Sequence, residues 1–150
     1  MALAASVLAA VVGTVFMTLS STTEMHVEGR EESTAPGKAA AFFLKLVGIE
    51  VEDGTTAMKV LSTWVHWLYG AAWGVGWWLL IAVAGLPLWL TAAAFFAIVW
   101  GGAAVNLTLT GVAPPPWKWG AKYVLLDWMH HLVYVGGTTL GWVWIEAIAT

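Results

Sequence analysis

The chain has 150 residues, which leaves room for one domain and no second one. Hydrophobic residues make up 60% of it and charged residues only 10%, a balance that excludes an ordinary soluble domain because the surface of such a domain must be solvated. The net charge of −3, without a basic stripe, argues against nucleic acid as a partner, and the absence of cysteine excludes disulfides and cysteine-based zinc sites.

Several apolar segments reach the roughly 20 residues that a helix needs to cross a bilayer. They predict an all-α, polytopic membrane four-helix bundle that forms a single transmembrane domain over residues 1–150, with the lipid bilayer as its first partner. We expect its helices at about residues 3–26, 55–84, 87–110 and 118–149, with a polar connection at about 22–54.

The polar connection contains a short apolar segment, residues 38–49, which cannot span a membrane by itself. Phe42, Phe43, Leu46 and Val47 fall on one face of a helix drawn through it, and the lysines of the segment fall on another. This pattern is typical of an interfacial helix that lies on the bilayer. A short cap packed on the bundle explains the same pattern equally well.

The basic residues indicate the orientation of the bundle. All six lie in or beside the first and last connections: Arg30, Lys38, Lys45, Lys59, Lys118 and Lys122. The positive-inside rule therefore predicts that both connections are cytoplasmic and that both termini lie outside. We expect an outer aromatic belt of tryptophans on the opposite side, formed by Trp77, Trp78, Trp89, Trp142 and Trp144.

The two helix hairpins look like weak copies of each other. When the second predicted helix is placed on the fourth, His66 aligns with His131 and Tyr69 with Tyr134. Parallel repeats of this kind imply a pseudo-twofold axis along the membrane normal. The repeat therefore predicts that His66 and His131 lie at equal depth on symmetry-related helices.

Three short motifs suggest a family: Gly13-Thr14…Met17-Thr18, His66-Trp67-x-Tyr69-Gly70-x-x-Trp73-Gly74 and Asp127…His131-x-x-Tyr134. Together they resemble the small YagU-like bacterial inner-membrane proteins, over most of the chain. The resemblance implies a multi-pass protein of the bacterial inner (plasma) membrane, and it supplies no catalytic residues. The long charged connection is a departure from that pattern.

Polar residues inside a membrane are costly and usually face the interior of the bundle, which makes them candidates for a site. The predicted cytoplasmic half contains six of particular interest: His66, Tyr69, Asn106, Asp127, His131 and Tyr134. We expect this cluster to bind or conduct a proton or a small polar solute, without enzymatic chemistry. A structural accessory subunit of a membrane complex, in which the same residues only join helices, is an alternative.

A second alternative uses His66 and His131 as ligands of a haem or a divalent metal, which their equal depth would allow. Glycines near them could make room for a flat macrocycle. The spacings Gly70-x-x-x-Gly74 and Gly137-x-x-x-Gly141 are, however, typical of close helix packing, which would compete with haem for the same space. No cofactor is the leading expectation, and a homo-oligomer or a partner membrane subunit is expected because four short helices enclose little space.

Overall fold

The computed structural model describes residues 2–149 and contains helices, turns and no strand within that range. The elements in chain order are α1 (Ala2–Val27), α2 (Ala35–Leu46), α3 (Thr56–Trp78), the π-helical η1 (Leu79–Val83), α4 (Leu88–Leu109), the 3-10 helix η2 (Pro116–Lys118) and α5 (Ala121–Ala149). The all-α prediction is confirmed. Met1 and Thr150, the two ends of the predicted domain, lie outside the described residues.

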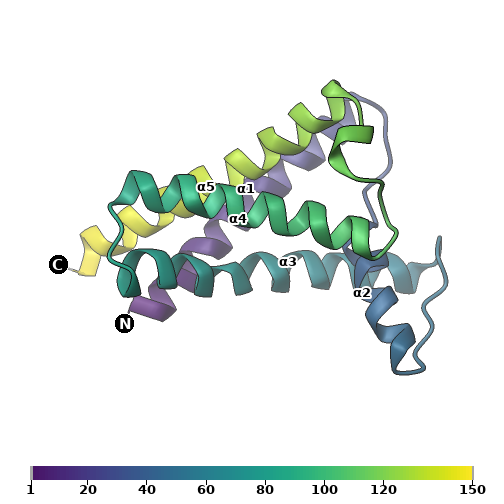
Figure 1. Ribbon diagram of the computed structural model, residues 1–150, viewed down its shortest axis with the longest axis horizontal. Coiled ribbons are helices and arrows are strands. Elements are labelled where there is room, and N and C mark those ends of the chain that lie inside the picture. Colours follow the sequence, from purple (N-terminus) through teal and green to yellow (C-terminus); the bar gives the residue numbers. More distant parts are fainter. Residues whose placement is uncertain (1, 150) are drawn as a thin grey trace.

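The four long helices alternate in direction, and α1 and α5 are inclined to α3 and α4 (Figure 1). Both ends of the described chain lie at one end of the bundle, and the long connections lie at the other (Figure 1). Helix α1 packs along both α3 and α5, while α4 packs chiefly against α5. Helix α1 is therefore the central element, and it separates much of α3 from α5.

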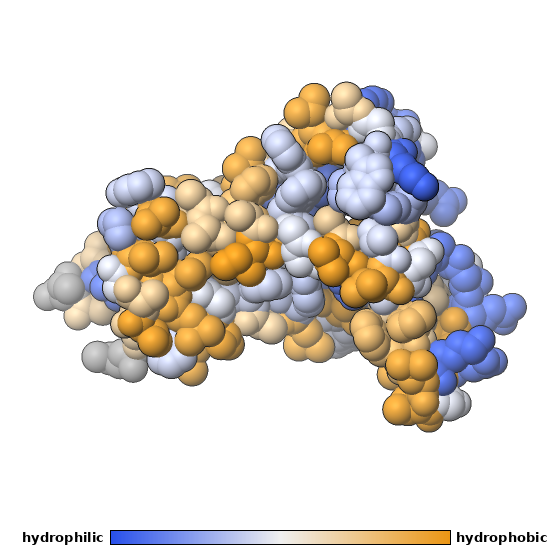
Figure 2. Space-filling model, in the orientation of Figure 1, coloured by the Kyte–Doolittle hydropathy of each residue, from blue (hydrophilic) through white to orange (hydrophobic). Residues whose placement is uncertain are grey.

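Three of the helices, α1, α4 and α5, are long and apolar enough to cross a membrane by length and composition. Hydrophobic residues cover much of the visible face, and hydrophilic residues gather at the end that carries the long connections (Figure 2). These features indicate a membrane protein. Helix α3 is not among the three, since Lys59, His66 and its tryptophans and hydroxyl residues make it less apolar.

Local signals in the sequence explain where these helices begin and end. Thr55 caps α3, because its side chain accepts a hydrogen bond of 3.3 Å from the backbone N–H of Met58. The turn before α4 has Gly85 in the left-handed region, with φ of 65°, and Pro87 stands at the N-cap position of α4. The predicted tight turn between these two helices is therefore present.

An aromatic core joins α3, α4 and α5. Trp77 and Phe95 are both fully buried, with ring centroids 5.2 Å apart, and Tyr134 stacks on Phe95 at 5.8 Å. The assignment of Trp77 and Trp142 to an exposed outer belt is wrong, because both side chains turn into the helix interfaces and at most 9% of either is exposed. Hydropathy locates a tryptophan along a helix but does not tell which way the helix is rotated.

Glycines allow α1 to approach its neighbours closely. A Cβ atom added to Gly74 would lie 2.5 Å from the Cα of Val7, and one added to Gly70 would overlap the side chain of Thr14. On α5, a Cβ at Gly137 or Gly141 would lie 3.0 to 3.2 Å from backbone atoms of α1. All four glycines that the sequence predicts at helix contacts thus face α1, as small residues at membrane helix interfaces commonly do.

Helix α2 has one packed face and one exposed face. One face packs on α3, where Gly37 and Ala39 are buried and the N–H of Gly37 donates to Ser62 Oγ at 3.3 Å. The opposite face leaves Phe43 and Leu46 exposed. The helix begins at Ala35, earlier than predicted, because proline suits the first turn, and it ends at Leu46 rather than residue 49.

Candidate functional site

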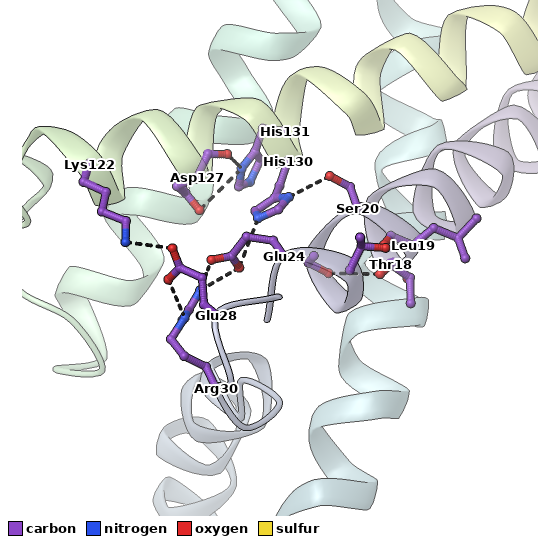
Figure 3. Close-up of polar contacts among 12 residues, drawn as sticks. Thr18, Leu19, Ser20, Glu24, Glu28, Arg30, Lys122, Asp127, His130 and His131 are labelled. Atoms are coloured by element: carbon purple, nitrogen blue, oxygen red, sulfur yellow. Dashed lines mark hydrogen bonds and ion pairs between the residues drawn. The ribbon is translucent and has the colours of Figure 1, made fainter. Parts of the chain in front are cut away.

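A chain of polar contacts connects α1, the first connection and α5 at the end of the bundle that carries the long connections (Figure 3). We call it the rim network, and it consists of Ser20, Glu24, Glu28, Arg30, Lys122 and His130. Each member touches at least one other member. The network therefore extends from a buried histidine to exposed charges at the surface.

His130 is the inner end of the rim network and is only 9% exposed. Its Nδ1 lies 2.9 Å from Ser20 Oγ, and its Nε2 lies 3.8 Å from a carboxylate oxygen of Glu24. A neutral imidazole donates a hydrogen bond from one ring nitrogen and accepts one at the other, whereas a protonated imidazole donates from both nitrogens. A serine hydroxyl can serve either state, and protonation would turn the contact with Glu24 into an ion pair. His130 can thus gain or lose a proton without losing its partners.

Arg30 closes the network from the first connection. Its Nη2 lies 2.5 and 2.6 Å from the two carboxylate oxygens of Glu24, and its Nε lies 3.2 Å from Glu28. The backbone puts it there: Gly29 has φ of 64°, and the N–H of Arg30 donates to the carbonyl of Met25 at 2.9 Å. This is the hydrogen-bond pattern of a helix that ends at a left-handed glycine.

Lys122 connects the network to α5, with its Nζ 2.7 Å from a carboxylate oxygen of Glu28. The hydrogen bond from Lys122 is the largest influence on that carboxyl and holds the pKa of Glu28 below its usual range. The hydrogen bond to Glu24 likewise raises the pKa of Arg30 above its usual value. Glu28 and Arg30 are therefore charged at neutral pH.

A second group of polar contacts lies deeper and joins helices in pairs. Thr18 Oγ1 lies 2.7 Å from the carbonyl oxygen of Thr14 and 2.9 Å from His66 Nε2. A hydroxyl carries a single proton, which it donates to the carbonyl, so the imidazole of His66 is the donor in the second contact. This bond ties α3 to α1.

Asp127 ties α5 to α4. Its carboxylate accepts a hydrogen bond of 2.8 Å from the indole N–H of Trp100, while its other oxygen lies 3.6 Å from Nδ1 of His131. The closer partner of that nitrogen is the backbone carbonyl of Asp127, at 2.8 Å. Tyr134, in turn, donates from its hydroxyl to the carbonyl of Gly70 at 2.7 Å and so ties α5 to α3.

The structure divides the six residues that the sequence groups in one cluster. Asp127 lies beside His131, but His66 is bonded to α1. The Tyr69 side chain is 41% exposed and packs against Trp73. Asn106 contributes its backbone carbonyl to a bond with a neighbouring threonine. The reason for the division is the central position of α1, which gives His66 and His131 different partners.

The space predicted for a macrocycle is occupied. Thr14 lies against Gly70, and Phe16 lies 3.1 Å from the position of a Cβ on Gly137, so α1 fills the space that a haem would need. Within residues 2–149, no three His, Cys, Asp or Glu side chains are grouped in a way that could hold a metal ion. The geometry therefore does not favour His66 and His131 as a pair of ligands.

The six-residue cluster predicted from the sequence contains no member of the rim network, although the sequence carries one signal for the network. Ser20, Glu24 and Glu28 follow each other at a spacing of four residues, which places them on one face of a helix. Their partners lie elsewhere in the chain, and no local pattern indicates them. The predicted cluster includes His131, which lies beside Asp127, whereas the neighbouring His130 faces Glu24 of the rim network.

Comparisons with known proteins supply no further information about this arrangement. No family model matches the sequence, and neither a curated protein nor a solved structure shows a significant match.

Proposed function

We propose that the chain is a four-span protein of a bacterial inner membrane, with α3 as the fourth span and both termini outside. Helix α3 runs beside α1 with close glycine contacts, and it is as long as the apolar helix α4. The basic residues lie at the end of the bundle that carries the long connections, which the positive-inside rule assigns to the cytoplasm. The resemblance to YagU-like proteins agrees with this location.

We further propose that the protein is not an enzyme and that the rim network binds a proton or a small polar solute at the cytoplasmic face. The observation that carries this proposal is the position of His130, which is almost buried between a hydroxyl and a carboxylate. Histidine is the side chain whose charge ordinarily changes near physiological pH. Its partners suit both protonation states, and protons can reach it through exposed charges.

Binding fits the remainder of the bundle better than conduction does. Beyond the rim network, the hydroxyls of Ser6, Thr14 and Thr138 donate to carbonyls of their own helices. The glycine contacts at Gly74 and Gly141 close the space between helices in the half of the bundle that lies away from the long connections. A conducted proton or solute would need a continuous row of polar groups there, so we assign the network to binding.

Histidine resonances measured against pH in the detergent-purified protein test this proposal. We expect the resonance of His130 to change as the pH is lowered, because its two partners suit either protonation state. Glu24→Gln should change the titration midpoint of His130. The control Glu52→Gln, at an exposed position outside the network, should leave it unchanged. A His130 resonance that does not change with pH while the protein stays folded would disprove the proposal.

A structural accessory subunit is the second candidate, and the ion pair between Lys122 and Glu28 favours it because that pair fastens α5 to the end of α1. In this case the network would only hold helices together, and the protein would assemble with copies of itself or with a partner membrane subunit. A titrating His130 whose midpoint depends on Glu24 distinguishes the first candidate from the second.

A further inference from the structure

A groove of about 550 Å³ runs between α1 and α5 on the outside of the bundle. Its walls are apolar over much of their length, with Phe16 and Leu19 contributed by α1 and Met129 and Val133 contributed by α5. Its polar end is formed by Glu24 and Glu28 of the rim network. The groove is therefore amphipathic along its length, with the polar end at the connections.

The length of the groove corresponds to one leaflet of a bilayer. From Phe16 to Val27 the α1 wall of the groove is helical, so it rises about 17 Å at ~1.5 Å per residue. One leaflet measures about 15 Å of hydrocarbon and about 20 Å with its polar region. In the orientation proposed above, the apolar walls face acyl chains and the carboxylates lie at the level of headgroups.

The charges at the polar end favour a headgroup that carries both an ammonium and a phosphate. Glu24 and Glu28 line the groove, while Arg30 and Lys122 bind them from beside it. A carboxylate has about four lone-pair sites, so each one can accept a further N–H donor. The side chains of Lys122 and Arg30 remain partly exposed, and their positive charges would attract a phosphate.

We propose that this groove is a binding site for an aminophospholipid of the phosphatidylethanolamine type. One acyl chain lies along the apolar walls, the primary ammonium donates to Glu28 and Glu24, and the phosphate lies near Lys122. Phosphatidylglycerol has no ammonium for the carboxylates, and the quaternary ammonium of phosphatidylcholine has no N–H to donate. The site thus selects a primary amine. This proposal rests on the membrane placement proposed above but not on proton binding by His130.

Native mass spectrometry of the detergent-purified protein tests the site, with equal amounts of dioleoyl phosphatidylethanolamine, phosphatidylcholine and phosphatidylglycerol. We expect the wild type to retain phosphatidylethanolamine at least threefold more than either other lipid. Glu28→Gln should reduce that ratio to about one by removing the charge, and Val133→Trp should reduce retention by filling the groove. The control Leu132→Trp, an exposed position next to the groove, should behave as the wild type.

Equal retention of the three lipids by the wild type would overturn the proposal, since the groove would then hold any lipid. An unchanged preference in Glu28→Gln would also overturn it, and this variant changes a surface position and needs no refolding of the core. The result is separable from proton binding: a lipid preference with a non-titrating His130 removes the function proposed above and leaves the lipid site standing. Equal retention of the three lipids together with a titrating His130 removes only the lipid site.

Discussion

Gly74→Ala is expected to lower the thermal stability of the protein by several degrees and to increase its aggregation in detergent. The added methyl group would lie 2.5 Å from the Cα of Val7 and 2.7 Å from the carbonyl oxygen of Ser6. Both are backbone atoms of α1, so neither can turn aside, and the two helices must separate. Overpacking costs about 1–3 kcal/mol where side chains can adjust, and a backbone overlap belongs at the upper end of that range or above it.

Gly136→Ala is the matched control for this experiment. A Cβ at Gly136 meets nothing within 4 Å, although the residue lies in the same kind of apolar helix. Alanine is about 1 kcal/mol more favourable than glycine inside a helix, so this variant should be as stable as the wild type or slightly more stable. Thermal unfolding followed by circular dichroism measures both. Equal melting temperatures for the two variants would show that α1 does not pack on α3 as described.

Trp100→Phe is expected to loosen α4 from α5 and to lower stability by about 1.5–3 kcal/mol, the range for a hydrogen bond to a charged group. We expect a loss at the lower end of this range, because 32% of the Asp127 side chain is exposed and water can replace the lost hydrogen bond. The indole of Trp100 donates to that carboxylate and also packs edge-on against Trp128 at 5.4 Å. Since α4 packs chiefly against α5, few other contacts can replace this one.

A double-mutant cycle separates the hydrogen bond from the loss of indole volume. Trp100→Phe and Asp127→Asn should each destabilise the protein, and the double variant should cost less than the sum of the two. Trp89→Phe removes the same indole nitrogen at a position that is 72% exposed, and it should leave the melting temperature unchanged. Additive effects in the cycle would mean that Trp100 and Asp127 do not interact.

The positions of the helices could be predicted from the sequence because they depend on local patterns. Runs of apolar residues predict the bodies of α1, α4 and α5, and the glycine spacing in α3 predicts a close helix contact without indicating that α1 makes it. The rotation of each helix about its own axis is harder to predict from the sequence. The sequence predicts Trp77 in a surface belt, but its side chain is fully buried because it packs against Phe95 of another helix.

The site was harder to predict than the fold, and the two neighbouring histidines show why. His130 and His131 are adjacent in sequence, and about 100° of rotation separates their side chains on a helix of 3.6 residues per turn. Only the placement of α1 determines which of them meets Ser20 and Glu24. Arg30 depends in addition on a left-handed glycine, which folds the chain back onto the end of α1.

The most direct measurement of the central claim is the sidedness of the connections on either side of α3. The natural sequence has no cysteine, so single cysteines can be introduced at the exposed positions Glu32 and Ala84 and labelled with a membrane-impermeant maleimide. If α3 crosses the membrane, Ala84→Cys is labelled from outside intact cells and Glu32→Cys only after the membrane is permeabilised. Labelling of both positions from the same side would show that α3 does not span, and it would contradict the four-span protein proposed above.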